Sequence, residues 1–495
     1  MNIPLPGPEM LVNGKFRTGP TQRDVINPAT GQAFAKVYMA DADIAHEAIA
    51  SARAAQPAWG ALAPLQRAAV MREIARLIRQ DAEDYARLIV SEQGKTIKEA
   101  RGEVGGAAEF FSYFSEFARR IQGEILPSDH AGEQIWVQRL PLGVVGAIIP
   151  WNYPFALVAR KVAPALIAGN TVVLKSHEET PLSALAMARI FDRAGVPAGV
   201  VNILSGTGPE VGEALCTAPD IDLITMTGSV PTGKRIMANA AQNLTPVSLE
   251  LGGKAPFIVM ADADLDLAVR SAATSRYMNC GQVCICNERT YVERPVYDAF
   301  VEKFLAVSAS LRVGDPMDPA TDIGPKVNLA ELEKVEARVA QALSEGAELL
   351  MGGHRPDHSP TEGGFYYTPT VLTGLRPDMA ILRDETFGPV VPIVPFDTFD
   401  DVVEQANDSR YGLSAYLFTN DMRRIMRAVN EIDFGEIYVN RIGPESLQGF
   451  HTGFRNSGPG GDDGVHGLDK YLRKKTVYIN YSGSNTVDLM PYPAG

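Results

Sequence analysis

The feature that most constrains the fold of this 495-residue chain is an alternation of short apolar runs with helical stretches from Gly143 onward. The runs have the length of strands, and the connections between strand and helix are short. This rhythm is that of repeated βαβ units, which build a parallel sheet covered by helices on both faces. The runs that we expect to form its strands are Val144–Ile149, Thr171–Leu174, Val200–Leu204 and Leu223–Thr225.

A second α/β pattern begins near Gly252. A chain of this length is too long for one hydrophobic core, so we predict two α/β domains of similar size with ligands bound between them. The segments that carry the second pattern are the strands Ala255–Met260 and Val390–Pro395 and the helices Val296–Leu311 and Leu329–Ser344.

The first 120 residues are predicted to be mostly helical, since Ala-rich amphipathic patterns fill them. Thr180 and Pro181 are typical of a helix start, with Thr as the N-cap and Pro at the first helical position. Gly443–Gly464 is dense in Gly, Pro and polar residues and predicts a long ordered loop, a kind of loop that is often functional. The remaining predictions are short strands and turns at Leu11–Phe16 and Val25–Gly31, a last strand at Val477–Tyr481, and helices at Asp43–Trp59, Leu65–Leu88 and Lys98–Ile121.

Composition excludes several kinds of partner. The net charge of −13 argues against a nucleic acid or an anionic membrane surface. No apolar run approaches the roughly 20 residues that span a bilayer, and Met1–Pro6 does not resemble a secretory signal. Four cysteines do not make a disulfide framework in so long a chain, which favours reduced thiols and a cytoplasmic location. Seven scattered histidines lack the spacing of a zinc site, so no metal is expected.

Three of the four cysteines, Cys280, Cys284 and Cys286, fall within seven residues, among glycine and polar residues. A thiol whose neighbours include glycine can be approached closely by a substrate, which indicates a nucleophile. The pattern alone does not say which sulfur this is.

Two polar side chains follow predicted strands. Asn152 comes after the run Val144–Ile149, where an amide N–H can stabilise an oxyanion, although on this motif alone a structural Asn in a Pro-bounded turn is the simpler explanation. Glu250 precedes Gly252 and Gly253 between two strands, where it can act as a general base or as a solvated turn carboxylate.

Three further motifs fit a nucleotide. Gly206-Thr207-Gly208 opens a helix, but the next glycine is Gly212, so the dinucleotide spacing is not met. Thr227-Gly228-Ser229 precedes a helix whose N-terminus would suit a phosphate, or it is simply a turn. Lys175 and Glu178 follow a strand and can form hydrogen bonds with the two hydroxyls of a ribose, or they belong to a surface loop of mixed charge.

The order of these motifs along the chain resembles that of the aldehyde dehydrogenase superfamily. The match runs from about Leu11 to Tyr481 and carries Trp151-Asn152, Lys175 with Glu178, Thr227-Gly228-Ser229, Glu250-Leu251-Gly252-Gly253, Asn279-x-Gly281-Gln282-x-Cys284 and Glu385-Thr386-Phe387-Gly388-Pro389. Ser176-His177 departs from the usual Pro-Ser of the family. The resemblance implies an α/β fold of two doubly wound parallel-sheet domains, one Rossmann-like and one catalytic, with a small β oligomerisation element.

The resemblance also implies roles for single residues. Cys284 would be the nucleophile, Asn152 with the Cys284 N–H the oxyanion site, and Glu250 the base that activates water for thioester hydrolysis. A carboxylate at Glu178 would repel the extra phosphate of NADP, so NAD is expected to be preferred. The residues expected to bind the cofactor are Ile148, Pro150, Trp151, Lys175, Glu178, Gly208, Gly228, Ser229, Glu385 and Phe387.

Within the superfamily the chain looks most like the lactaldehyde and glycolaldehyde dehydrogenase branch. Arg160, Tyr153, Glu445 and His451 are the residues that we expect at the substrate, where they would contact a polar group such as a 2-hydroxyl. Arg160 could instead merely anchor the loop. A rival substrate class is an ω-semialdehyde such as succinic semialdehyde, whose carboxylate would pair with Arg160. A binding or structural protein that has lost catalysis is the alternative of another class.

The resemblance gives domain boundaries and an assembly. Family members bury the last strand against a partner chain, which implies a homo-oligomer, a dimer or tetramer. Cys280 is expected to be a packing thiol, and Cys286 either a passive neighbour of Cys284 or its partner in a strained, reversible disulfide. The expected segments are a cofactor domain (1–120 and 141–251), a catalytic domain (252–443), an oligomerisation element (121–140 and 465–482), a substrate loop (444–464) and a tail (483–495).

Overall fold

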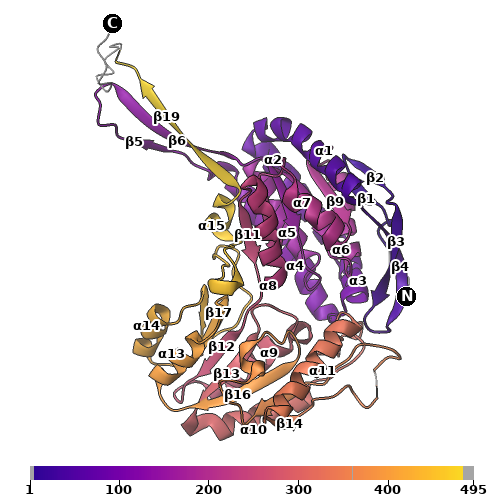
Figure 1. The fold of residues 1–495 in the computed structure, drawn as a ribbon, viewed down its shortest axis with the longest axis vertical. Coiled ribbons are helices and arrows are strands. Elements are labelled where there is room, and N and C mark those ends of the chain that lie inside the picture. Colours follow the sequence, from indigo (N-terminus) through magenta and orange to yellow (C-terminus); the bar gives the residue numbers. More distant parts are fainter. Residues whose placement is uncertain (1–4, 359, 483–495) are drawn as a thin grey trace.

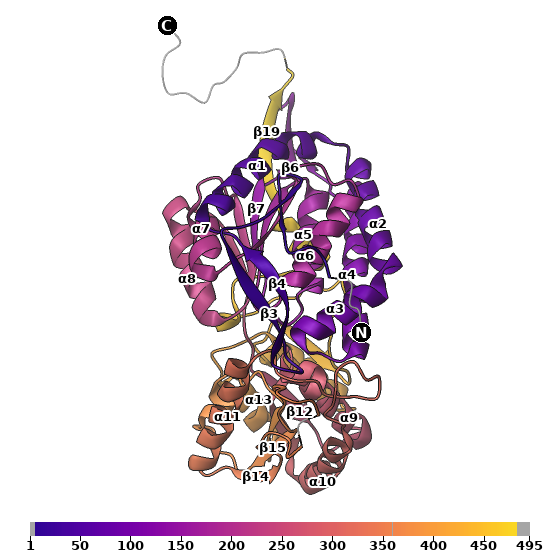
Figure 2. The ribbon, with the colours of Figure 1, turned by 90° about the vertical axis from the view of Figure 1, so that its right-hand side faces the viewer.

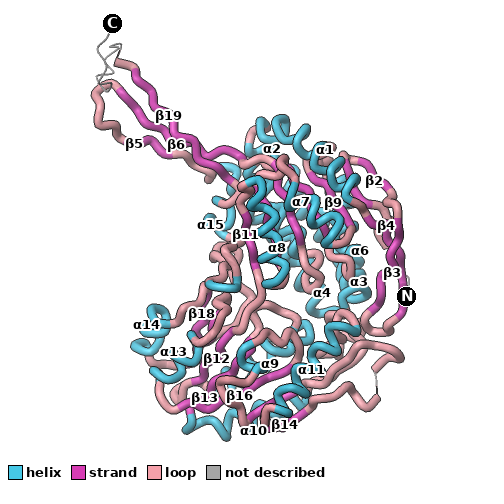
Figure 3. The backbone as a smooth tube through the Cα atoms, in the orientation of Figure 1, coloured by secondary structure: helices cyan, strands magenta, loops and turns pink. Residues whose placement is uncertain are grey.

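The computed structural model describes residues 5–358 and 360–482, and the predicted tail (483–495) lies outside them. Two seven-stranded sheets dominate the described residues, and one lies above the other in Figures 1 and 2. Helices flank the strands of both sheets (Figure 3). The predicted fold class, α/β with two parallel-sheet domains, is confirmed. No helix in the described part of the chain is both long and apolar enough to cross a membrane.

The first sheet has the strand order β11-β10-β7-β8-β9-β1-β2. The five neighbouring strands β11, β10, β7, β8 and β9 are parallel to one another, as predicted. Strands β1 and β2 add an antiparallel edge next to β9. The parallel strands are almost wholly buried because helices cover both faces. The bounds are β1 (Met10–Val12), β2 (Lys15–Arg17), β7 (Val144–Ile148), β8 (Thr171–Ser176), β9 (Val201–Ser205), β10 (Leu223–Thr227) and β11 (Val247–Glu250).

The second sheet has the order β14-β15-β16-β13-β12-β17-β18. It is parallel except for β14, which pairs antiparallel with β15 at one edge. The carboxyl ends of such strands are where ligands gather. The bounds are β12 (Ala255–Val259), β13 (Asn287–Glu293), β14 (Glu348–Met351), β15 (Thr370–Thr373), β16 (Val390–Phe396), β17 (Ser414–Phe418) and β18 (Glu436–Val439).

A three-stranded antiparallel sheet, β19-β6-β5, projects away from the rest of the molecule as an arm (Figure 1). A separate hairpin of β3 and β4 lies against the first sheet's side of the molecule (Figure 2). The last strand is longer than predicted because it pairs with β6 along its whole length. The bounds are β3 (Thr21–Asn27), β4 (Gln32–Met39), β5 (Glu124–Leu126), β6 (Glu133–Pro141) and β19 (Leu472–Asn480).

The helices follow the predicted rhythm, with short additional turns. The α-helices are α1 (Ala42–Ala61), α2 (Pro64–Gln80), α3 (Ala82–Gln93), α4 (Ile97–Ser115), α5 (Ala156–Ala168), α6 (Pro181–Arg193), α7 (Glu213–Thr217), α8 (Val230–Ala240), α9 (Leu265–Tyr277), α10 (Arg294–Ser310), α11 (Leu329–Ser344), α12 (Ala380–Arg383), α13 (Phe399–Asn407), α14 (Met422–Glu431) and α15 (Gly464–Asp469). The short turns are η1 (Glu116–Arg119), the π-helical η2 (Gly208–Gly212), η3 (Ala241–Asn243), η4 (Met278–Gly281) and η5 (Arg455–Ser457).

One local prediction was wrong. The helix expected over Leu65–Leu88 is two helices, because Asp81 leaves the helical conformation (φ −111°, ψ 26°) and its carboxylate pairs with Arg193 of α6 at 2.6 Å. Asp competes with helical backbone in this way more readily than straight-chain residues do. Thr180 is the N-cap of α6 and Pro181 is its first residue, as predicted, and the Thr180 side chain makes no cap hydrogen bond.

Glu92 caps α6 instead. Its buried carboxylate accepts hydrogen bonds from the backbone N–H groups of Leu182 and Ser183, at 2.8 and 2.7 Å. These are donors that the first turn of a helix leaves unpaired. The cap therefore comes from a residue about 90 positions away, which no local sequence pattern could indicate.

Candidate active site

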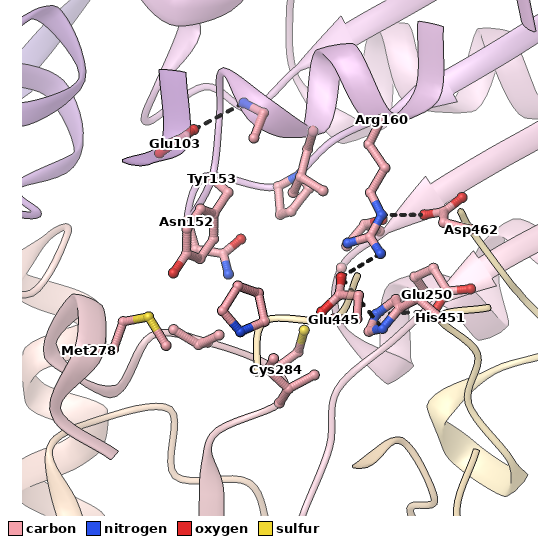
Figure 4. Close-up of a pocket in the computed structure, with 18 of the residues that line it drawn as sticks. Glu103, Asn152, Tyr153, Arg160, Glu250, Met278, Cys284, Glu445, His451 and Asp462 are labelled. Carbon is pink, nitrogen blue, oxygen red and sulfur yellow. Dashed lines mark hydrogen bonds and ion pairs between the residues drawn. The ribbon is translucent and has the colours of Figure 1, made fainter. Parts of the chain in front are cut away.

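One cavity of about 1280 Å³ is lined by residues that follow strands of both sheets. Asn152 follows β7 and Glu250 ends β11 in the first sheet, while Cys284 precedes β13 in the second. Figure 4 shows Asn152 on one side of Cys284, and Glu250 and His451 on the other. Three residues that are separate in sequence therefore meet at one cavity.

The three clustered cysteines differ in accessibility. Cys284 is partly exposed and lines the cavity, whereas Cys280 and Cys286 are each 1% exposed. Burial raises the pKa of Cys280 to about 11 and that of Cys286 to about 12, so both are neutral thiols at pH 7. Cys284 is thus the sulfur of the cluster that a substrate in this cavity can reach.

The cysteine segment has an unusual backbone. Asn279, Cys280 and Gly281 adopt the left-handed conformation, with φ of 49°, 55° and 73°. A Cβ on Gly281 would lie 2.3 Å from the carbonyl oxygen of Gly388, so only glycine fits there. This tight turn ends α9 and places the following residues, including Cys284, at the cavity wall.

Asn152 is buried, and its side chain has a partner. The amide Nδ2 donates to the carbonyl oxygen of Gln282 at 3.0 Å, which fixes the side chain beside the cysteine segment. The amide group carries two N–H donors, so this bond leaves one hydrogen to offer. The backbone carbonyl oxygen of Asn152 accepts from Lys95 Nζ at 2.8 Å and from Asn279 Nδ2 at 3.1 Å.

Glu250 is 3% exposed, and neither carboxylate oxygen has a hydrogen-bond partner within the described residues. Burial raises the pKa of Glu250 to about 7, with Asp462 adding to the rise and His451 opposing it. A carboxylate that titrates near neutral pH and has both oxygens free can take a proton from water. Glu250 is therefore a buried carboxylate and not the solvated turn carboxylate of the alternative reading.

His451 lies next to three carboxylates. Its Nδ1 is 3.2 Å from Glu436 and 3.8 Å from Glu445, and its Nε2 is 3.8 Å from Glu250. Burial and Arg160 act to lower the pKa of His451, but Glu445, Glu436 and a hydrogen bond with Cys284 outweigh them and raise it well above the usual value. The ring is therefore an imidazolium at neutral pH, and it places a positive charge between the thiol and the carboxylates.

Arg160 of α5 holds the 444–464 loop at both ends. Its Nη2 pairs with Glu445 at 2.6 Å and also contacts the carboxylate of Asp463. Its Nε lies 3.6 Å from Asp462, which in turn pairs with Lys161 at 2.7 Å. The anchoring role that the sequence left open for Arg160 is thus present, and Arg160, Glu445 and His451 also line the cavity. Tyr153 lines it as well, on the side of Asn152 (Figure 4).

Glu436, Glu445 and His451 offer three ligand atoms within 4.8 Å of one another, a spacing that could hold a metal ion. The positive charge at this place is already supplied by the His451 imidazolium and by Arg160, which pairs with Glu445. The arrangement is that of an internal ion-pair network.

The residues expected at the cofactor fall into two groups. Pro150, Trp151, Gly228, Ser229, Glu385 and Phe387 line the cavity, whereas Ile148, Lys175, Glu178 and Gly208 lie outside its lining, at the carboxyl ends of β7 and β8 and at the start of η2. Lys175 Nζ is 3.4 Å from Glu178, so the pair that we expected to grip a ribose is formed. A Cβ on Gly212 would lie 3.8 Å from Lys175 Cδ, which brings the glycine turn η2 beside this pair.

The expected cofactor residues that line the cavity fit a dinucleotide. Ser229 is the N-cap of α8 and makes no cap hydrogen bond there, so the first N–H groups of the helix remain available for a phosphate. Glu385 accepts from Gly253 N at 3.0 Å, and a Cβ on Gly252 would lie 2.2 Å from Glu385 Oε2. The rings of Trp151 and Phe387 meet edge to face, 5.5 Å apart. The donor set suits phosphate and ribose, which agrees with the expected nicotinamide cofactor.

Five residues of the site were missed from the sequence: Lys95, Lys161, Glu436, Asp462 and Asp463. Glu436 is close in sequence to its partner His451, whereas the partners of the other four are between 57 and about 300 residues away. Asp463 has one signal that could have drawn notice, since it stands in the glycine-rich loop. Its positive φ of 67° and its burial mark it as a constrained position.

The fold and the site together are those of an oxidoreductase in which a dinucleotide-binding site and a nucleophilic thiol lie at the same cavity. The chain belongs to the aldehyde dehydrogenase family, whose model matches residues 16–477. It is 47% identical to 3,6-anhydro-alpha-L-galactose dehydrogenase of Vibrio sp. (strain EJY3), with 96% of this chain and 99% of that protein covered. It is 46% identical to lactaldehyde dehydrogenase of Escherichia coli K12, with 97% and 100% covered.

A solved structure agrees with these relatives. The structure of 3,6-anhydro-L-galactose dehydrogenase in complex with NAP matches with a TM-score of 0.94 at 47% identity, over 95% of this chain and 99% of that one. The family that the sequence motifs resembled is therefore confirmed, and the protein is an enzyme that oxidises aldehydes.

Proposed function

We propose that this enzyme oxidises a small hydroxyaldehyde, of the lactaldehyde or glycolaldehyde kind, to its carboxylate with NAD. The observation that supports it most is the meeting of Cys284, Asn152 and Glu250 at one cavity, with Arg160, Glu445 and His451 beside them. The first three residues supply the chemistry. The second three supply the recognition of a polar substituent.

Attack on the aldehyde begins at Cys284. The thiolate is the reactive form of a cysteine, and the His451 imidazolium lies beside the sulfur. Addition to the carbonyl carbon forms a thiohemiacetal and puts negative charge on the carbonyl oxygen. The free N–H of the Asn152 amide and the backbone N–H of Cys284 are the donors that we assign to this oxyanion.

The nicotinamide ring, when bound, supplies the hydride acceptor for the oxidation. Loss of the hydride leaves a thioester on Cys284, and water must then cleave it. Glu250 takes a proton from this water, and its pKa of about 7 lets it do so at neutral pH. The Glu250→Gln variant is expected to form one equivalent of NADH per site in a burst and then stall, whereas Cys284→Ser gives no burst.

The charges around Arg160 favour a hydroxyl over a carboxylate on the substrate. Its guanidinium already pairs with Glu445 and Asp463, and Asp462 lies nearby. A substrate carboxylate would have to displace Glu445 or lie against it, and like charges in a buried site repel. A hydroxyl can donate to Glu445 and accept from Arg160 or His451 at the same time. The ω-semialdehyde class is the second candidate, since Arg160 can carry a carboxylate if Glu445 moves away.

The substrate assignment is tested by comparing kcat/KM for lactaldehyde, propanal and succinic semialdehyde. We expect lactaldehyde to exceed propanal by at least about tenfold, which is about 1.4 kcal/mol of recognition of one hydroxyl. Arg160→Leu should remove most of this difference. Equal efficiency for lactaldehyde and propanal contradicts hydroxyl recognition, and a preference for succinic semialdehyde supports the second candidate. A broad aldehyde panel without NADH formation would indicate a silent member of the fold.

The assembly and the location are part of the proposal. The arm of β5, β6 and β19 exposes Ile125 (73%) and Tyr478 (67%), apolar surface that a second copy of the chain could cover. We propose a homo-oligomer, a dimer or tetramer, in the cytoplasm. Light scattering on the purified enzyme measures the number of subunits, and a monomer at micromolar concentration would contradict the proposal.

The reversible disulfide between Cys284 and Cys286 stays a prediction. Cys286 is 1% exposed and packs beside Cys284.

A further inference from the structure

We propose that Lys95 is a positioning residue for the oxyanion site, because its buried ammonium holds the backbone of Asn152 and the ring of Tyr153. This inference rests on the proposed role of Asn152 and adds to it a residue of the α3–α4 connection that the reaction itself does not touch. Lys95 lies two residues after α3 and two before α4.

The Lys95 side chain is 0% exposed and makes three contacts. Its Nζ donates to the Asn152 carbonyl oxygen at 2.8 Å and lies 2.6 Å from Glu103 Oε2. It also stands 3.5 Å from the centroid of the Tyr153 ring, which is the geometry of a cation–π contact. Two of these contacts are to consecutive residues of the loop that carries the oxyanion donor.

Glu103 of α4 completes the arrangement. Its other oxygen accepts from the backbone N–H groups of Phe155 and Ala156, at 2.8 and 3.1 Å, where α5 begins. One carboxylate therefore pairs with Lys95 and caps the helix that follows the Asn152 loop. Lys95 and Glu103 together fix the loop at two successive points, Asn152 and the start of α5.

The same connection also reaches the cysteine segment. Gln93 accepts from the Lys95 backbone N–H and donates to Asn279 Oδ1 at 3.0 Å. Asn279 in turn donates to the carbonyl oxygen of Asn152, the atom that Lys95 also binds. Gln93 and Lys95 thus set the spacing between the loop of the oxyanion donor and the loop of Cys284. A displacement of about 1 Å between such groups costs on the order of 100-fold in rate.

A lysine suits this place for a physical reason. A buried carbonyl oxygen accepts a charge-assisted hydrogen bond more strongly than a neutral one, and Glu103 offsets the buried charge. A purely structural ion pair would affect folding and every ligand alike. A positioning residue acts on the rate of attack through Asn152, and this difference can be measured.

The test is a double-mutant cycle. Lys95→Met alone would leave the buried charge of Glu103 without its ion-pair partner. The variant is therefore Lys95→Met with Glu103→Gln, which keeps an acceptor for the backbone N–H groups of Phe155 and Ala156. It is made in the wild-type and in the Asn152→Ala backgrounds. The control is Lys98→Met, which removes an exposed lysine of α4 that lies 3.8 Å from its nearest carboxylate. The rate of the NADH burst reports acylation, and protein fluorescence reports NAD binding.

We expect the burst rate to fall at least about tenfold in the wild-type background and less than about twofold in the Asn152→Ala background, with NAD affinity and the control unchanged. An equal loss in both backgrounds, or no loss, overturns the positioning role. If Asn152→Ala itself leaves the burst rate unaltered, the proposed oxyanion site fails, and this inference fails with it. Should the Met variant not fold, Lys95→Gln with Glu103→Gln gives the same comparison, since glutamine is too short to reach Asn152.

Discussion

Removal of the His451 charge should shift the pH at which Glu250 becomes active. The His451 Nε2 and Glu250 Oε2 atoms are 3.8 Å apart. At an effective dielectric constant of about 20, two unit charges at this distance interact by about 4 kcal/mol, which corresponds to about three pKa units. The imidazolium charge is delocalised over both ring nitrogens, and only Nε2 faces Glu250, so we take about one third of this value for Glu250.

The sign follows from the charge. The imidazolium favours the ionised carboxylate, so His451→Gln raises the pKa of Glu250 from about 7 to about 8 or above. Asp462, Glu436 and Glu445 remain in the variant and act in the same direction. At pH 7 the ionised fraction of Glu250 falls from about one half to about one tenth, so hydrolysis of the thioester slows by about fivefold.

The assay is the pH dependence of kcat between pH 5.5 and 9.5, with propanal as substrate so that hydroxyl recognition plays no part. A burst of NADH before the steady state shows that hydrolysis is the slow step, and the rising limb of the profile then reports Glu250. His46→Gln, an exposed histidine of α1, is the control. A rising limb that stays at the wild-type pH, or moves to lower pH, would refute the electrostatic argument.

Two further substitutions have matched controls. Gly253→Ala would place a Cβ 2.5 Å from the carbonyl oxygen of Cys284, so we expect a loss of at least about tenfold in kcat/KM, whereas Gly105→Ala, whose Cβ meets nothing within 4 Å and which lies outside the cavity lining, should keep full activity. An active Gly253→Ala enzyme would contradict the tight packing of the cysteine segment. Glu178→Gln should raise kcat/KM with NADP relative to NAD by at least about tenfold, because a carboxylate repels the extra phosphate, and Glu179→Gln is the control. An unchanged ratio would contradict the assignment of NAD preference to Glu178.

The sequence predicted much of this fold because its signals are local. Apolar runs of strand length stand where β7, β8, β9 and β10 form, and Leu329–Ser344 is the helix α11 to the residue. Parallel topology then brings the ends of these strands to one edge, which is why Asn152 and Glu250 could be expected near each other. The choice of Cys284 among three thiols came from the resemblance, and the burial of Cys280 and Cys286 now supplies a physical reason.

What the sequence did not predict depends on tertiary partners. Glu92 caps a helix about 90 residues away, and Lys95 binds a carbonyl oxygen 57 residues away, so neither makes a local pattern. The break at Asp81 is of the same kind, because the ion pair with Arg193 stabilises a conformation that helix propensity alone does not favour. The cation at His451 likewise follows from three carboxylates contributed by separate segments.

The short segment that connects the two large sheets bears on how ligands enter and leave the site. Only Leu251–Lys254 separate β11 from β12, and all four residues are buried. Gly253 N is bonded to Glu385, and Lys254 pairs with the buried Glu288 at 2.6 Å. A hinge needs residues that are free to turn about their backbone bonds, and here none is. Substrate and product would therefore enter and leave through the cavity itself, whose lining includes residues of α4 and α11, without a rotation of one sheet against the other.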